Sequence, residues 1–140
     1  NRYRGYCEAL ARQKLELDRT LIVNVKQTLD GGYHGGVELL ARKTSFSAVF
    51  CANDATAMGT IKALGENGRS VPKDVPVICI DDVEMARYFT PMLTTIHIPI
   101  NELGRQAAKT LIDRIENGHV LPMKTELPFS LARRDSCVEV

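Results

Sequence analysis

Residues 46–68 read FSAVFCANDATAMGTIKALGENG, and this stretch decides the fold. Phe46–Ala52 is a nearly continuous apolar run, which is typical of a parallel strand covered on both faces. A helix is expected over Ala55–Asn67, and Gly68 suits the left-handed residue that follows a helix end. A buried strand that turns directly into a helix is the repeating unit of α/β folds.

Two predicted strands end in polar side chains that suit a ligand site. Asn53 follows the strand Phe46–Ala52, and Asp81 follows a second apolar strand, Val75–Ile80. Ligands of open α/β sheets bind beyond the carboxyl ends of strands that lie about 4.8 Å apart, so one small polar ligand could reach both side chains. The alternative is that both are turn and cap residues, a role that both types favour. Asp54 is expected to cap the helix beside it.

The rest of the chain alternates between helical and extended patterns. This order favours right-handed βαβ units, and hence an α/β fold with a parallel sheet flanked by helices. Glycines around Tyr33 and His34 indicate a loop before the second helix, while Asn101 is expected to cap the last helix and Gly118 to end it. The expected helices cover 2–17, 37–43, 55–67 and 102–117, and the expected strands cover 21–25, 46–52, 75–80, 93–98 and 124–131.

The composition is that of an ordinary soluble globular domain. The 140 residues are 44% hydrophobic and 25% charged, with 18 basic and 17 acidic residues and a net charge of +1. No basic cluster offers a phosphate-binding surface, so the chain alone is not expected to bind DNA. The apolar runs are too short for a membrane span, and no signal-peptide pattern opens the sequence.

The cysteines and histidines lack the spacing of a metal site. Cys51 and Cys79 fall inside predicted buried strands, so the four cysteines are interpreted as small core residues in a reducing compartment. The three histidines are far apart, and no G-x-S-x-G nucleophile elbow is present. We therefore expect no metal, no cofactor and no catalytic residue.

Three further patterns have a functional and a structural interpretation. Adjacent carboxylates do not face each other across a scissile bond, so Asp81–Asp82 is interpreted as one site residue and one cap of the next turn. The glycines from Gly31 to Gly36 match no phosphate-binding motif. Arg133 and Arg134 are interpreted as solvated charge.

A series of short motifs, taken together and in order, resembles one known family. The motifs are R-x-R-GY over 2–6, AND-x-x-A-x-G over 52–59, VP-x-D-V-x-V-x-x-x-DD over 71–82, RYFTP-x-LTTI over 87–96, LG-x-x-A over 103–107 and LARRDS over 131–136. They resemble the C-terminal part of the LacI/GalR family of bacterial transcriptional regulators, with features of both its galactose-repressor and its purine-repressor branch. The resemblance covers nearly the whole chain.

The resemblance implies a periplasmic-binding-protein-like (type I) fold, in which two α/β subdomains enclose an effector. Residues of about 1–97 and 123–140 would form the C-terminal subdomain. Residues of about 98–122 would supply a crossover and one helix of the N-terminal subdomain. The helix-turn-helix DNA-binding headpiece is absent from this sequence.

The family's effector contacts fall on four positions of this sequence by motif. They are Arg2, Asn53, Asp81 and Phe89, the last of which matches a position close to the effector. The resemblance implies a small-molecule effector, a sugar or a purine. DNA would be bound only through the absent headpiece, by a cytoplasmic protein with no membrane contact.

A homodimer is also implied by the resemblance. The family's dimer contacts involve the helix after Asn53 and the region around Tyr88. Candidate interface residues are Met58, Ile61, Leu64 and Phe89, with core packing the favoured role of Ile61 and Leu64.

A different class of protein shares this fold. The alternative function is a periplasmic solute-binding protein of a sugar transporter, which has a motif like AND-x-x-A-x-G. The LTTI and LARRDS motifs favour the regulator, and an enzyme has the weakest support because no nucleophile–base set is visible.

Overall fold

The computed structural model of the protein describes residues 2–118, 122 and 124–138, which form helices around a four-stranded sheet. The helices are α1 (Arg2–Arg12), α2 (Leu29–Ala41), α3 (Asp54–Glu66) and α4 (Ile100–Asn117), with the short 3₁₀ turns η1 (Arg19–Leu21) and η2 (Glu84–Arg87). The strands are β1 (Val49–Phe50), β2 (Val77–Asp81), β3 (Thr94–His97) and β4 (Ser130–Ala132).

The sheet has the order β1-β2-β3-β4. Strands β1, β2 and β3 are parallel, and Ile78 pairs with both Phe50 and Thr94. This arrangement confirms the predicted α/β class. Strand β4 is antiparallel to β3, with Ile96 opposite Leu131, because the chain returns along β3 after α4.

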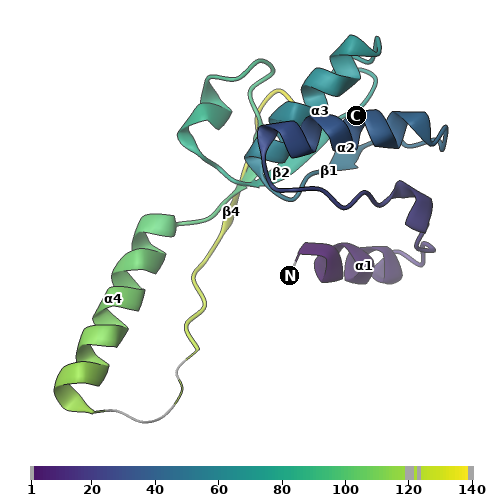
Figure 1. Ribbon diagram of the computed structural model, residues 1–140. Helices are drawn as coiled ribbons and strands as arrows, with labels where there is room; N and C mark the ends of the chain where they lie inside the picture. The colour runs from purple at the N-terminus through teal and green to yellow at the C-terminus, as the bar shows by residue number, and fades with distance from the viewer. Residues whose placement is uncertain (1, 119–121, 123, 139–140) are drawn as a thin grey trace.

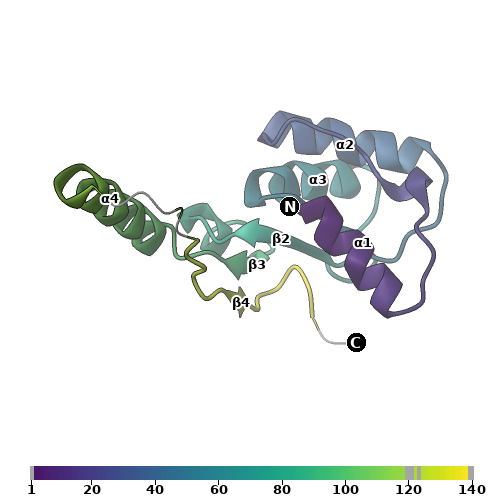
Figure 2. The ribbon, with the colours of Figure 1, turned by 90° about the horizontal axis from the view of Figure 1, so that it is seen from below.

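The helices lie on both faces of the sheet and beyond its end. Figures 1 and 2 show α2 and α3 side by side on one face, α1 on the other side, and α4 projecting away from the rest. Alternate residues of β2 point to opposite faces: Val77 and Cys79 are buried in the core, and Ile80 lines an apolar hollow with Phe50 and Tyr6 of α1. The carboxyl ends of β1 and β2 are therefore framed by α1 on one side and α3 on the other.

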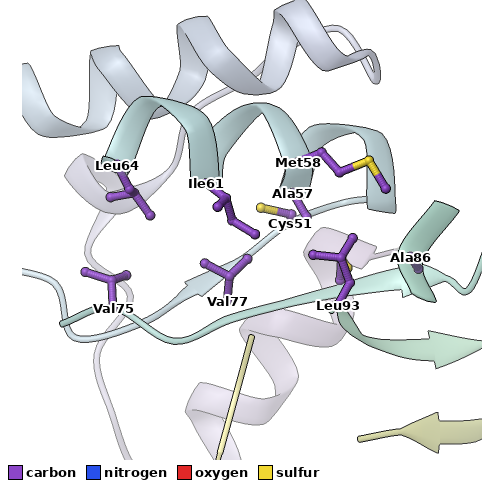
Figure 3. Packing of buried hydrophobic residues seen from close by; sticks show 10 residues of the cluster. Cys51, Ala57, Met58, Ile61, Leu64, Val75, Val77, Ala86 and Leu93 are labelled. Carbon is purple, nitrogen blue, oxygen red and sulfur yellow. The ribbon is translucent and has the colours of Figure 1, made fainter. Parts of the chain in front are cut away.

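The hydrophobic core lies between α3 and the sheet (Figure 3). Met58, Ile61 and Leu64 project from α3 onto the strands and are at most 8% exposed. The favoured core-packing role of Ile61 and Leu64 is confirmed, and Met58 lies in the same core cluster between α3 and the sheet. Phe89 packs against the same core cluster, so it is not a free surface residue either.

Helix α2 differs most from the sequence prediction. The glycine-rich stretch, expected as a loop, is helical from Leu29, with the Thr28 hydroxyl accepting the Gly31 amide at 3.0 Å. A Cβ on Gly32 would lie 2.2 Å from the Thr56 carbonyl oxygen. A Cβ on Gly59 would lie 2.0 Å from the Leu29 carbonyl oxygen. The glycines are thus needed for the close approach of α2 and α3.

Several predicted boundaries shift for local reasons. Helix α1 stops at Arg12, short of the predicted residue 17, and Lys14 has a left-handed φ of 57°. No strand forms over 21–25, because β1 is the edge of the described sheet and no neighbouring strand reaches this segment. Helix α4 starts at Ile100 after Pro99, with no side-chain cap, so Asn101 is not its cap.

Among the other expected element ends, the two glycine positions after helices are confirmed, and two strands are shorter than expected. Gly68 and Gly118 both have positive φ after the helices that they follow, at 73° and 64°. The predicted strand 46–52 is reduced to Val49–Phe50, and β4 begins later than the predicted 124–131. No helix within the described residues is long and apolar enough to cross a membrane.

The segment after β4 is anchored in the sheet by Ser136, which is fully buried. Its hydroxyl donates to the Val77 carbonyl at 2.7 Å and accepts the Thr94 amide at 2.8 Å. Its own amide donates to the Met92 carbonyl at 2.9 Å. One short side chain therefore joins β2 and β3 at their amino ends.

Replacing Gly59 by alanine tests the close contact of α2 and α3. The new methyl group would collide with the Leu29 carbonyl, so the helices must separate, and the free energy of unfolding should fall by about 2 kcal/mol or more. Urea denaturation of the intact protein measures this change. Gly65→Ala is the matched control on the same helix. Nothing lies within 4 Å of its new Cβ, so a gain of about 0.5–1 kcal/mol is expected. Equal effects of the two substitutions would contradict the close contact.

Candidate ligand-binding site

Asn53 is the residue that caps α3. Its Oδ1 accepts the Thr56 amide at 2.9 Å, and the Thr56 hydroxyl accepts the Asn53 amide at 3.2 Å, which completes a capping box. The prediction that Asp54 is the cap is wrong, because Asp54 already lies in the first helical turn. The Asn53 amide group also donates to the Gln27 carbonyl at 3.4 Å. The side chain is half-buried and keeps hydrogen-bonding capacity beyond these two contacts.

Asp54 is buried and connects three elements. One carboxylate oxygen accepts the Thr95 hydroxyl of β3 at 2.6 Å, and the other accepts the Val83 amide at 2.7 Å. Its place at the amino end of α3 favours the negative charge, since the helix dipole is positive there. Asp54 therefore holds the turn that follows β2 against α3.

The predicted site residues at the ends of β1 and β2 lie at the same end of the sheet. Phe50 of β1 pairs with Ile78 of β2; Asn53 comes three positions after Phe50, and Asp81 comes three positions after Ile78. Because the two strands are parallel neighbours, both polar side chains come at the carboxyl end, where α/β proteins bind ligands. The structure thus supports the placement that the sequence predicted for this pair.

Arg2 and Asp81 come into direct contact, although they are far apart in sequence. Arg2 Nη2 of α1 donates to Asp81 Oδ1 at 3.1 Å, and the two side chains are 36% and 23% exposed. The Arg2 Nε atom is buried and has no hydrogen-bond partner among the described residues.

Asp81 combines a shifted pKa with an unusual backbone conformation. Burial raises the pKa of Asp81; Arg2 counters part of this shift, and the nearby charge of Asp54 adds to it. Asp81 also has a backbone φ of 127°, which residues other than glycine rarely adopt. Strain of this kind costs about 1–3 kcal/mol and is concentrated at functional sites.

The side chain of Asp82 is buried and has three basic partners. Its side chain is 4% exposed and binds Arg134 Nη2 at 2.5 Å and His97 Nδ1 at 3.0 Å, with Arg87 at 3.7 Å. Burial raises the pKa of Asp82, but the hydrogen bond and charge of Arg134, with His97 and Arg87, outweigh burial, so the net shift is downward.

Two interpretations from the sequence are wrong at this cluster. Asp82 does not cap η2, which has Val83 at its N-cap without a side-chain bond. Arg134 is not solvated charge, because its side chain is 13% exposed and donates to both Asp82 and the Leu93 carbonyl. Two adjacent acidic residues are the signal that could have suggested a buried basic partner.

The chain is similar to known proteins along nearly its whole length. A family model described as a periplasmic binding protein-like domain matches residues 1–137. The chain is 39% identical over 137 residues to the HTH-type transcriptional regulator AscG of Escherichia coli, covering 98% of this chain and 40% of AscG. It is 38% identical over 138 residues to the HTH-type transcriptional repressor PurR of Escherichia fergusonii, covering 99% of this chain and 40% of PurR.

A solved structure gives the same result. It is a LacI family transcriptional regulator from Enterococcus faecium with bound ribose, and it matches with a TM-score of 0.87 and 35% identity over 96% of this chain and 50% of that one. This chain belongs to the LacI family. It spans about two fifths of the length of the two curated relatives.

Membership of the LacI family confirms two expectations from the sequence. The fold is periplasmic-binding-protein-like. The relatives are transcriptional regulators, which confirms that the chain comes from a non-enzymatic family. They also favour a regulator over the solute-binding alternative.

The fourth predicted site residue of this LacI family chain has a different environment. Phe89 follows η2 and packs against the hydrophobic core. Its role near a ligand stays a prediction. The site that the described residues bring together is therefore Arg2 with Asp81, with Asn53 at the adjacent strand end.

Asp81→Asn tests whether the carboxylate is kept for binding and not for stability. A raised pKa means that the folded state binds the proton more tightly than the unfolded chain. The stability contributed by Asp81 is therefore highest at low pH and is lost as the pH rises through the raised value. Asparagine tolerates positive φ and carries no charge, so the variant should be as stable as the wild type or more stable at pH 7.

Denaturant unfolding across the acidic range measures this difference. The difference in unfolding free energy between Asp81→Asn and the wild type should shrink as the pH falls and the wild-type carboxyl becomes protonated. Each pKa unit of upward shift corresponds to about 1.4 kcal/mol. A variant that is clearly less stable at pH 7 would mean that the Arg2 contact outweighs burial.

Proposed function

We propose that this chain is the effector-sensing region of a bacterial transcriptional regulator and binds a small polar metabolite, a sugar or a purine. The observation that carries the proposal is the partly exposed Arg2–Asp81 pair at the carboxyl edge of the sheet. In this proposal Arg2, Asn53 and Asp81 contact the effector, and Phe89 lies beside it.

The chemistry of the pair suits a ligand that both donates and accepts hydrogen bonds. A guanidinium only donates, and an ionised carboxylate only accepts, so a hydroxyl group can serve both. The half-buried side-chain amide of Asn53 adds a donor and an acceptor at the same end of the sheet. Sugars present several such hydroxyls, and one similar regulator has ribose bound.

The effector site is proposed to lie between two subdomains, with residues of about 1–97 and 123–140 in one and about 98–122 in the other. Helix α4 has no buried residue among those described, and Figure 1 shows it projecting from the rest of the chain. A helix with an exposed apolar stripe needs a partner layer. The exposed apolar residues of α4 are Ile100, Leu103, Leu111, Ile112 and Ile115.

The proposed mechanism is a population shift between two arrangements of the subdomains. An effector that contacts both subdomains more favourably in one arrangement shifts the equilibrium by its difference in affinity, and by no more. In a dimer, this rearrangement changes the spacing of two helix-turn-helix headpieces outside this chain, and thereby the affinity for operator DNA. Such a regulator acts in the cytoplasm.

The homodimer is proposed to form through a surface around η2. Four exposed apolar side chains gather on or beside this turn, and clustered exposed apolar residues mark interaction sites. Tyr88, at 74% exposed, is the most open of them. The surface consists of Val83, Met85, Tyr88 and Met92.

The binding proposal predicts a loss of affinity in Arg2→Met and Asp81→Asn. Hydrogen bonds to charged groups contribute about 1.5–3 kcal/mol, so each variant should bind about 10- to 100-fold more weakly. Thermal shift of the intact protein with D-ribose, D-galactose and hypoxanthine selects the probe, and calorimetry measures its affinity.

Glu66→Gln is the matched control for this experiment. It removes a carboxylate that is also ion-paired, to Lys62, but at the far end of α3 from the site. Its affinity should equal that of the wild type. If Arg2→Met and Asp81→Asn bind as well as the control, these residues do not form the site.

The dimer surface is tested by Tyr88→Glu. A charge placed in an apolar contact should weaken association by at least about tenfold. Sedimentation equilibrium of the intact protein measures the dissociation constant. Val37→Glu, at an exposed apolar position of α2, is the control and should leave association unchanged. Equal dissociation constants for the two variants would place the interface elsewhere.

A further inference from the structure

The backbone at the end of β2 has an unusual conformation. Asp81 has a φ of 127° and Asp82 a φ of 58°, and neither is glycine. Aspartate visits the left-handed region near 58° at modest cost, but a φ of 127° lies outside it. Two consecutive residues of this kind persist only where the surrounding structure holds them.

The contact between Arg2 and Asp81 is too weak to hold this conformation. It is a single hydrogen bond at 3.1 Å between side chains that are 36% and 23% exposed. Ion pairs with this exposure contribute little, because water screens them and both side chains lose freedom. Another group must therefore fix the backbone at this point.

The side chain of Asp82 has the contacts that such a role requires. Both of its oxygens are used, one by Arg134 at 2.5 Å and the other by His97 at 3.0 Å. The carboxylate is 4% exposed, so these bonds are shielded from water. The two partners belong to other parts of the sheet: His97 ends β3, and Arg134 follows β4.

Arg134 is itself fixed to β3. Its Nη1 donates to the Leu93 carbonyl at 2.7 Å, while its backbone amide and carbonyl bond the Thr94 hydroxyl at 2.9 and 2.8 Å. On the other side of the turn, the Asp54 carboxylate accepts the Val83 amide at 2.7 Å. The Asp81–Asp82 turn is thus held from both sides by groups that cannot easily move.

We propose that Asp82, held by Arg134 and His97, is the positioning residue that fixes this turn and thereby directs the Asp81 carboxylate toward Arg2 and the ligand. Asp82 does not touch the ligand. The inference rests on the proposed function for the importance of Asp81, but the conformation itself can be tested without any ligand.

Asp82→Asn is the first test. Asparagine tolerates positive φ as well as aspartate does, so the substitution removes the charge and keeps the conformational tolerance. In a crystal structure of the intact variant, residue 81 should leave its positive φ, and the Arg2–Asp81 contact should exceed hydrogen-bond range. Affinity for the selected sugar or purine probe should fall about tenfold or more, the size of loss seen at metal sites when a group that orients a ligand residue is removed.

Arg134 provides a second, independent test. Arg134→Gln removes the charge that binds Asp82, whereas Arg134→Lys keeps a charge but loses the planar fork that reaches both Asp82 and the Leu93 carbonyl. Affinity should follow the order wild type, Arg134→Lys, Arg134→Gln. A purely stabilising role would lower the unfolding temperature of the variants and leave the affinity of the folded protein and the conformation of Asp81 unchanged.

The outcomes separate this inference from the proposed function. An unchanged φ at Asp81 with its Arg2 contact intact, in Asp82→Asn or in Arg134→Gln, would overturn the positioning role. Lost affinity in Asp81→Asn combined with wild-type affinity in Asp82→Asn would likewise remove only the role of Asp82. Wild-type affinity in Asp81→Asn would instead overturn the proposed function.

Discussion

Three parts of the protein meet at one buried carboxylate, that of Asp54. Removing a charge from water is costly unless hydrogen bonds replace the lost hydration, and here the Thr95 hydroxyl and the Val83 amide do so. The amino end of α3 adds a favourable dipole. As a result, α3, β3 and the turn after β2 cannot shift independently, and the strand ends that carry Asn53 and Asp81 keep a fixed relation.

In each of two pairs of adjacent polar residues, the two side chains have different environments and different structural roles. In Asn53–Asp54, the asparagine caps α3 at the sheet edge and the aspartate is buried between elements. In Asp81–Asp82, the first carboxylate faces Arg2 and the second is enclosed by basic partners. Successive side chains at a strand end point in different directions, so one residue of each pair can open to solvent while the other fixes the backbone.

The sequence is sufficient to predict the class of fold and the end of the sheet at which Asn53 and Asp81 lie. Apolar runs followed by helical periodicity identify β1, β2 and β3 in their order, and Asn53 and Asp81 follow from the ends of two of those runs. The prediction of Arg2 as a third candidate residue depends on the family resemblance, because no local pattern relates residue 2 to residue 81.

What the sequence could not supply are contacts between segments that are distant along the chain. Glycine is unfavourable in isolated helices, so the stretch 29–36 has the pattern of a loop, and only the closeness of α3 makes it helical. The burial of Arg134 depends on β4 pairing with β3. The segment 21–25 also depends on its neighbours: its residues suit a strand, but none forms because no other strand among the described residues lies beside it.

The buried Ser136 hydroxyl has a consequence for the order in which the protein can fold. It lies 42 residues after Thr94 and 59 after Val77, yet it supplies hydrogen bonds to both. Contacts over such separations form late, because the entropy of closing a long loop must be lost before they add stability. During synthesis, β2 and β3 therefore leave the ribosome well before the residue that joins them, and the amino ends of these strands remain incompletely bonded until the chain beyond β4 has been translated.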